Sequence, residues 1–395
     1  MNANAFPLDM WKRVAQDAEL LTAASDCDPT DVASVSRLRK QYAANEVGIA
    51  LELVQARKKT AIKFPEHADT LLADVPGIEQ ASSLRSAKHK AKRVAQAGLH
   101  HVLDVCCGIG GDAMGFSAEG LAVTAIDRDP VRAWMAQENA GCDSRVADAE
   151  SLLETGATAN TALHLDPARR TGAGRVFRLA DYQPEPATIA ALLARYPDAA
   201  VKLSPAVNLA ELDEHLPGAA PSGEIEFISE SGRLVQAVLW TGRLASNASR
   251  AATLLTPDQT HTLTGEPDEP GFSPAQRFLF TVDSAVERAG LMHLLELPAI
   301  HPRLGLLTAN HAVDSPWLTG FELLAELPYS AKNPKKIKAW LDDHDSGLVE
   351  IKTRGKAVDP DPLQRALRGT GTTPYTLFIL RFDQKLACLI CRRLR

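Results

Sequence analysis

The stretch that decides the fold is residues 101–149, HVLDVCCGIGGDAMGFSAEGLAVTAIDRDPVRAWMAQENAGCDSRVADA. It begins with a short apolar run that ends in a glycine-rich loop, residues 107–111. A helical segment, residues 112–119, and a second apolar run follow, and that run ends at Asp127. The pattern predicts a strand, a tight turn, a helix and a second strand. This is a βαβ unit of the kind that binds a nucleotide at the carboxyl ends of its strands.

The glycines and the second-strand acid of this stretch suit a ligand that carries a nucleoside. Gly108, Gly110 and Gly111 have no side chain, so the backbone can turn sharply and come close to a ligand. Asp127 lies at the tip of the second strand, where a carboxylate can accept hydrogen bonds from two ribose hydroxyls.

The glycine loop also fits the dinucleotide fingerprint, because Gly108-x-Gly110-x-x-Ala113 has the required spacing. Two acids favour S-adenosylmethionine (SAM) instead. Asp104 precedes the turn, where it would attract the cationic amino group of methionine and repel a diphosphate. Asp148 closes the next short run, where the adenine amino group needs an acceptor. The sequence therefore favours SAM, with an NAD(P)-dependent oxidoreductase as the less favoured alternative.

Two motifs in this stretch resemble those of class I methyltransferases that act on RNA. Residues 104–111 (DVCCGIGG) and 125–130 (AIDRDP) are similar to D-x-F-C-G-x-G-G and A-I-D-x-D-P of the trimethylguanosine synthase type. The C-terminal end resembles the THUMP-like domain of a bacterial branch of these enzymes in four segments, LPYS (327–330), IKTRG (351–355), DP (359–360) and TLF (376–378). The resemblance implies a SAM-dependent methyltransferase with an RNA substrate, tRNA or rRNA, and favours an exocyclic amine of a base as the acceptor.

The expected fold class is α/β, with a Rossmann-like seven-stranded class I methyltransferase core. It is joined to an N-terminal helical domain and a C-terminal α+β (THUMP-like) module. Seven apolar runs supply the strands, and they are residues 102–106, 123–126, 144–147, 162–165, 199–203, 224–228 and 234–240. The short turn between the last two predicts an antiparallel final hairpin, whereas the earlier connections suit right-handed crossovers.

The expected cofactor site includes the acids and glycines above together with their neighbours. Its members are Asp104, Cys106, Gly108, Gly110, Gly111, Asp112, Asp127, Arg128, Asp148 and Ala149.

The acceptor site is expected at the end of the fourth strand, where Asp166, Pro167 and Arg169 are the candidate catalytic residues. Amino methyltransferases of this class typically have Asp, Asn or Ser there, followed by Pro-Pro and an aromatic residue. In this chain Ala168 and Arg169 replace the last pair. We expect Asp166 to orient the acceptor amine and Arg169 to position the substrate. The departure leaves open a second hypothesis, a SAM-binding, RNA-associated protein without catalytic activity.

Cysteine chemistry is not favoured by the sequence. A covalent C5 methyltransferase would need a nucleophilic cysteine, and the fifth strand ends Lys202-Leu-Ser-Pro205 without one. Cys388 and Cys391 lie in an alternating run, where positions three apart face opposite sides, and no second pair accompanies them. No metal site is predicted.

The chain of 395 residues is long enough for several domains. We predict a helical region at 1–98, with helices at 7–22 and 32–57, and the methyltransferase core at 99–245, where Asp129 caps a helix at 130–139. A linker with a hairpin around residues 256–259 and an α+β segment is expected at 246–320, and the THUMP-like domain at 321–395. The last part has 14 Lys and Arg against 9 Asp and Glu, although the whole chain has a net charge of −6. This asymmetry favours a polyanionic partner such as RNA. Neither a secretory signal nor a membrane span is recognised, so a cytoplasmic location is expected.

Overall fold

The computed structural model describes most of the chain, namely residues 6–156, 158–169, 178–218, 223–330, 334–354, 357–383 and 385–394. By their internal contacts the residues form two compact units. The first comprises residues 1–225 and 236–247, and the second comprises residues 226–235 and 248–395. Within the described residues, no helix has the length and apolar character needed to cross a membrane.

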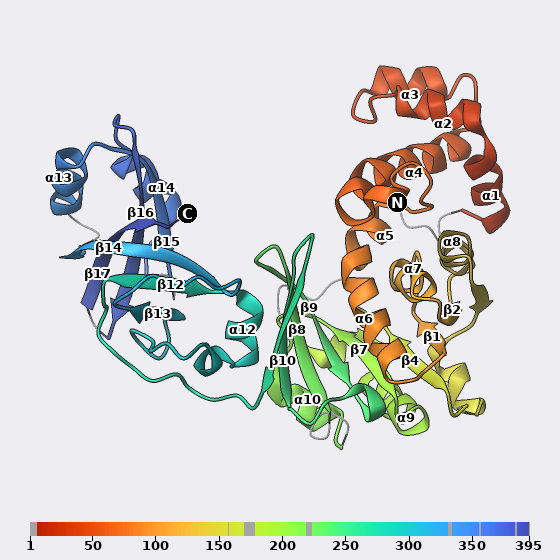
Figure 1. The fold of residues 1–395 in the computed structure, drawn as a ribbon. Helices are drawn as coiled ribbons and strands as arrows, with labels where there is room; N and C mark the ends of the chain where they lie inside the picture. The colour runs from red at the N-terminus through yellow and green to blue at the C-terminus, as the bar shows by residue number, and fades with distance from the viewer. Residues whose placement is uncertain are drawn as a thin grey trace. The chain divides into compact units, whose positions relative to one another are not determined.

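The first unit is built on a mainly parallel sheet that confirms the predicted Rossmann-like core (Figure 1). Six consecutive strands of this sheet have the order β9-β7-β4-β1-β2-β3, and β9 is antiparallel to β7. The strands are β1 (His101–Val105), β2 (Ala122–Asp127), β3 (Asp143–Val146), β4 (Thr161–Leu165), β7 (Ala199–Leu203) and β9 (Arg233–Trp240). A two-residue turn connects β9 to β8 (Glu224–Glu230), which gives the expected final hairpin. The sheet places the ends of β1 and β4 next to each other, because Asp104 and His164 are paired in register.

Helices and short elements complete the first unit. Those that follow the glycine loop are α7 (Gly111–Ala118), α8 (Pro130–Ala140), η3 (Ala149–Glu154), β5 (Ala168–Arg169), η4 (Leu179–Asp181), β6 (Tyr182–Gln183), α9 (Pro186–Arg195), α10 (Leu209–His215) and η5 (Gly242–Leu244). The start of α8 follows local rules: Asp129 accepts a hydrogen bond from the Val131 amide at 2.9 Å, and Pro130 occupies the first helical position.

The N-terminal region is helical, as predicted, and packs against the core rather than standing apart. Its elements are α1 (Leu8–Gln16), α2 (Ala18–Ser25), α3 (Val32–Leu38), α4 (Ala44–Lys63), η2 (Pro65–His67), α5 (Val75–Gln80) and α6 (Leu84–Gln96). One buried apolar cluster joins Trp11 and Leu53 of these helices to Met114 of α7 and Met135 of α8. Figure 1 shows these helices, in red and orange, beside α7 and α8.

Two long helices predicted from the sequence are each divided in the structure. The segment 7–22 is two helices because the Asp17 carboxylate accepts a hydrogen bond from the Leu20 amide at 2.9 Å and starts α2. The segment 32–57 ends its first helix at Leu38 and starts again at Ala44. The basic residues of helix α6 do not all lie on a solvated face. Lys90 is fully buried, and Arg93 forms a bidentate ion pair with buried Glu224.

The second unit contains the predicted α+β module. Its six-stranded sheet has the order β13-β12-β14-β17-β16-β15, with β12 (Phe278–Val282), β13 (Leu306–Ala309), β14 (Leu318–Pro328), β15 (Ser346–Thr353), β16 (Thr373–Phe382) and β17 (Lys385–Arg393). Its helical elements are α12 (Ser284–Ala289), η6 (Met292–Leu295), α13 (Lys335–Asp343) and α14 (Pro360–Leu367). The hairpin expected around residues 256–259 joins β10 (Arg250–Leu255) to β11 (Thr260–Gly265).

Cys388 and Cys391 lie on opposite faces of the second unit's sheet. Cys388 packs in the cluster that contains Leu341 of α13, and Cys391 packs in a different cluster with Phe321. In the described parts of the chain, no group of three or more His, Cys, Asp or Glu side chains is placed to hold a metal ion.

Candidate active site

The glycine loop follows β1 in a left-handed backbone conformation. Cys106, Gly108 and Gly110 have φ angles of 58°, 56° and 82°. A Cβ atom at Gly110 would lie 2.7 Å from the Ala136 Cα of α8, so only glycine fits between the loop and that helix. A Cβ atom at Gly108 would meet no heavy atom within 4 Å. The loop is therefore tight on its α8 side and open at Gly108.

Asp127 fastens the loop to the end of β2. Its Oδ2 accepts a hydrogen bond from the Gly108 amide at 3.0 Å, and its Oδ1 accepts one from the Asp129 amide at 3.0 Å. Burial raises the pKa of Asp127, and the two amide hydrogen bonds oppose that rise. Each carboxylate oxygen has a second lone pair, so both can still accept a hydrogen bond from a ribose hydroxyl.

Asp104 is fully buried at the end of β1, and its two oxygens differ. Oδ1 lies 2.7 Å from Nδ1 of His164 on β4. Oδ2 is buried and has no hydrogen-bond partner in the described part of the chain. Burial raises the pKa of Asp104, and the neighbouring His164 opposes that rise. A buried acceptor without a partner is costly, so Oδ2 is suited to a donor from a ligand.

Asp112, in the first turn of α7, is held by other side chains instead. Lys90 Nζ lies 2.5 Å from Oδ1, and the Ser82 hydroxyl donates to Oδ2 at 2.9 Å. Burial alone would raise the pKa of Asp112, but the positive charges of Lys90, His164 and Lys202 outweigh burial and lower it. Asp112 thus lies within an internal ion pair.

Asp166 follows β4 and is paired with a lysine from the next strand. Lys202 Nζ of β7 lies 2.7 Å from Asp166 Oδ2, and the Asp166 side chain is 32% exposed. Burial would lower the pKa of Lys202, but Asp166 and Asp112 reverse the shift and raise it. Pro167 connects Asp166 to β5. The Arg169 backbone lies in β5, but its side chain, like Arg170, is outside the described residues.

The remaining predicted residues lie at the edge of this region. Arg128 is exposed and donates to Gln183 Oε1 at 3.5 Å. Asp148 is exposed, and Ala149 is buried at the start of η3. Gly111 begins α7.

The cysteines beside the loop are poor nucleophiles. Burial raises the pKa of both Cys106 and Cys107, and the surrounding carboxylates raise it further. Cys107 packs against Ala125 and Ala136 as a small apolar residue.

Comparison with known proteins identifies the family. An S-adenosylmethionine-dependent methyltransferase of Mycobacterium tuberculosis, named as uncharacterised, is 31% identical over 328 residues, and the same figures hold in a second strain. The match covers 80% of this chain and 87% of the relative. The chain belongs to the S-adenosylmethionine-dependent methyltransferases.

Two family profiles match separate parts of this methyltransferase. The RNA cap guanine-N2 methyltransferase family matches residues 99–151, and the THUMP domain-like family matches residues 318–393. The crystal structure of a candidate methyltransferase from Porphyromonas gingivalis is similar in fold, with a TM-score of 0.71 at 18% identity over 98% of each chain. These matches confirm the predicted class I core, the THUMP-like domain and SAM as the cofactor.

The residues around the glycine loop fit SAM. The buried Oδ2 of Asp104 offers an acceptor for its amino group, Asp127 offers acceptors for its ribose hydroxyls, and the open space at Gly108 allows close approach.

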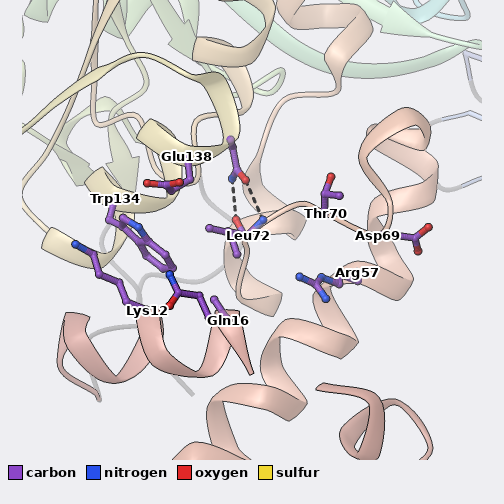
Figure 2. Close-up of a pocket in the computed structure, with 10 residues that line it drawn as sticks. Lys12, Gln16, Arg57, Asp69, Thr70, Leu72, Trp134 and Glu138 are labelled. Carbon is purple, nitrogen blue, oxygen red and sulfur yellow. Dashed lines mark hydrogen bonds between the residues drawn. The ribbon is translucent and has the colours of Figure 1, made fainter. Parts of the chain in front are cut away.

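A separate pocket of ≈ 550 Å³ lies between α1, α4, α8 and the segment before α5 (Figure 2). Its lining mixes two cations, Lys12 and Arg57, with two carboxylates, Asp69 and Glu138, beside the Trp134 ring. Figure 2 shows Arg57 directed into this space and Asp69 directed away from it. None of the predicted cofactor residues lines the pocket, so the candidate active site is the loop region and not this cavity.

The structure adds residues that sequence reasoning missed. His164 and Lys90 form ion pairs with the buried acids Asp104 and Asp112, and Lys202 pairs with the partly exposed Asp166. The sequence does indicate two of these residues, because His164 and Lys202 interrupt the otherwise apolar runs TALHL and AAVKL. A polar side chain in a buried parallel strand needs a partner, and here the partners are the site acids.

Proposed function

We propose that this methyltransferase acts on RNA and transfers the methyl group to an exocyclic amine of a base. The similarity of residues 99–151 to RNA cap guanine-N2 methyltransferases supports this substrate class, and so does the THUMP-like domain at 318–393. The basic excess of the C-terminal part is consistent with a polyanionic partner.

The observation that carries the proposal is the Asp166–Lys202 pair beside the glycine loop. Lys202 donates a hydrogen bond to Oδ2, which leaves Oδ1 to accept a hydrogen bond from an amine N–H. Such a bond turns the nitrogen lone pair toward the cofactor. In this arrangement Asp166 orients the amine.

For methyl transfer, the protein mainly has to align the acceptor amine with the methyl group and to exclude water. The bound cofactor supplies a methyl group on a cationic sulfur and leaves as a neutral thioether. In the proposed site, Asp104 holds the cofactor's amino group, Asp127 holds its ribose, and Asp148 accepts from its adenine. Arg169 positions the RNA. The methylated amine then loses its proton to solvent or to Asp166.

The test is methyl transfer from labelled SAM to total RNA, followed by mass spectrometry of the nucleosides. We expect a methylated amino nucleoside, and we expect Asp166→Ala to lower kcat by about 100-fold or more, which corresponds to the loss of orientation. Asp198→Asn is the matched control, because Asp198 also forms an ion pair, with Arg243 at 2.8 Å, away from the loop. Transfer that is unchanged in Asp166→Ala would contradict the acceptor site.

A second candidate is a SAM-binding, RNA-associated protein without catalytic activity. The observation that favours it is the Ala168-Arg169 pair in place of the usual proline and aromatic residue. Binding of S-adenosylhomocysteine without any label transfer to RNA would support this alternative.

A further inference from the structure

The region beneath the glycine loop contains a chain of buried charges that reaches from the donor side of the site to the acceptor side. Asp104 contacts His164, whose Nε2 lies 3.6 Å from Asp112 Oδ2. Asp112 pairs with Lys90, and Lys202 of the neighbouring strand β7 pairs with Asp166, which directly follows β4. All of these residues belong to the first unit.

His164 occupies the centre of this chain. Its side chain is 1% exposed, and its ring packs edge-on against Phe116 with the ring centroids 5.3 Å apart. A carboxylate lies at each ring nitrogen: Asp104 from β1 faces Nδ1, and Asp112 from α7 faces Nε2. Nδ1 is within hydrogen-bond distance of Asp104, whereas Nε2 has no hydrogen-bond partner in the described part of the chain and lies 3.6 Å from Asp112, which is within the range of an ion pair. An imidazolium is attracted to both carboxylates, and a neutral ring is not.

The charge count of the network leads to the same form of the ring. Asp104 and Asp112 are two buried carboxylates, and Lys90 is one buried cation, whereas the partly exposed Asp166 is paired with Lys202. An imidazolium at His164 supplies the second buried cation and leaves neither buried carboxylate uncompensated, which matters because an unpaired buried charge is strongly destabilising.

We propose that His164 is a positioning residue for the methyl donor: its imidazolium keeps Asp104 ionised and fixed through Oδ1, so that the free Oδ2 accepts a hydrogen bond from the amino group of SAM. The proposal rests on the assignment of Asp104 to the cofactor and does not depend on RNA as the substrate. It assigns a function to a strand residue that touches neither the cofactor's ribose nor the acceptor.

Removal of the imidazolium has a consequence that depends on pH. Burial already raises the pKa of Asp104, and His164 opposes that rise. Without the ring the pKa of Asp104 rises further, so the carboxyl stays protonated and neutral up to a higher pH, and in that form it accepts poorly from an ammonium group. In a variant without the His164 ring, the affinity for the cofactor therefore increases as the pH increases and Asp104 becomes ionised. Lys90 and Lys202 act on Asp112 and Asp166, and they remain in the variant.

The experiment is calorimetric titration of the full chain with S-adenosylhomocysteine between pH 6 and 8.5. We expect His164→Leu to lower the affinity at least tenfold at pH 7 and to make it rise more steeply with pH than in the wild type. His164→Asn, whose amide can still donate to Asp104 Oδ1, should recover part of the affinity. His101→Asn is the control, because His101 lies on β1 like Asp104 but bonds Thr124 and Thr161 at the opposite end of the strand.

The Asp104→Asn variant separates the possible failures. If Asp104→Asn weakens binding and folded His164→Leu does not, His164 has a structural role only and the proposal is overturned. If Asp104→Asn leaves the affinity intact, the assignment of Asp104 fails, and the proposal fails with it.

If His164→Leu does not fold, His164→Asn must show the pH-dependent loss of affinity. An affinity in that variant equal to the wild type at every pH overturns the proposal. None of these outcomes bears on the RNA substrate, which methyl transfer tests separately.

Discussion

At the scale of single residues, Gly110 in the glycine loop has to be glycine for two reasons: its left-handed backbone and its close contact with α8. Gly110 has a φ of 82°, and a Cβ atom there would lie 2.7 Å from the Ala136 Cα. Gly98 has a similar φ of 71° but no heavy atom within 4 Å of a Cβ position. The two glycines therefore separate backbone strain from overpacking.

We predict that Gly98→Ala lowers the free energy of unfolding by about 1 kcal/mol, the cost of a left-handed alanine. Gly110→Ala should lower it by about 1–3 kcal/mol more, because α8 has to move away from the loop. Urea denaturation of both variants measures the difference. Equal losses would mean that α8 accommodates the methyl group without cost.

Asp127 carries a second prediction at this scale. Its carboxylate is the proposed acceptor for the ribose hydroxyls and also the acceptor for the Gly108 amide. Asp127→Ala should weaken binding of S-adenosylhomocysteine by about 10- to 100-fold, since hydrogen bonds to a charged group contribute about 1.5–3 kcal/mol. Calorimetry measures the affinity. Asp143→Ala is the control, because Asp143 is exposed at the opposite end of the neighbouring strand β3. An unchanged affinity in Asp127→Ala would remove Asp127 from the site.

At the scale of elements, the sequence predicted those parts of the fold that local chemistry determines. The glycine loop, the capped start of α8 and the β10–β11 hairpin follow from residues a few positions apart, and the structure has them where expected. The division of residues 7–22 into α1 and α2 depends on one side chain, Asp17, whose capping bond competes with a continuous helix.

The candidate site was predictable in part for the same reason. The acids and glycines belong to short motifs, but His164 and Lys202 reach them from other strands. Such contacts depend on strand order and register, which link residues 60 and 36 positions apart in the sequence. The basic character of α6 is a comparable case: Lys90 and Arg93 are drawn inward by Asp112 and Glu224, which no pattern within the helix reveals.

An ion pair between elements gives the third prediction. Asp74, fully buried, caps α5 through the Gly77 amide and forms a salt bridge with Arg132 of α8 at 2.7 Å. Asp74→Ala should lower the free energy of unfolding by about 3–5 kcal/mol, because it leaves Arg132 without its buried partner. In the double variant Asp74→Ala, Arg132→Met, part of that loss should be recovered. A double-mutant cycle by chemical denaturation measures the coupling, and a coupling near zero would show that the helix cap alone matters.

At the scale of the whole molecule, the charges are distributed unevenly along the chain. The net charge is −6, but the THUMP-like part carries a basic excess that includes Lys335, Lys336 and Lys338 at α13. A net negative protein that binds a polyanion needs its cations gathered on one part of the surface. If the proposed RNA substrate is correct, these lysines are candidates for phosphate contacts. Lys338 also pairs with Asp342 at 2.9 Å, a weak exposed pair that a phosphate can replace.

The last prediction follows from the salt dependence of such contacts. Replacement of Lys335, Lys336 and Lys338 by Gln should weaken RNA binding and reduce the slope of log K against log salt by about 2–3, since each lost phosphate contact removes about 1. Binding of S-adenosylhomocysteine should not change. Replacement of the exposed Arg37, Arg39 and Lys40 at the end of α3 by Gln alters the net charge equally and is the matched control. A filter-binding series from low to high salt separates the two. If both triple variants change the slope by the same amount, net charge and not the α13 lysines governs the association. If neither does, RNA contacts the chain elsewhere.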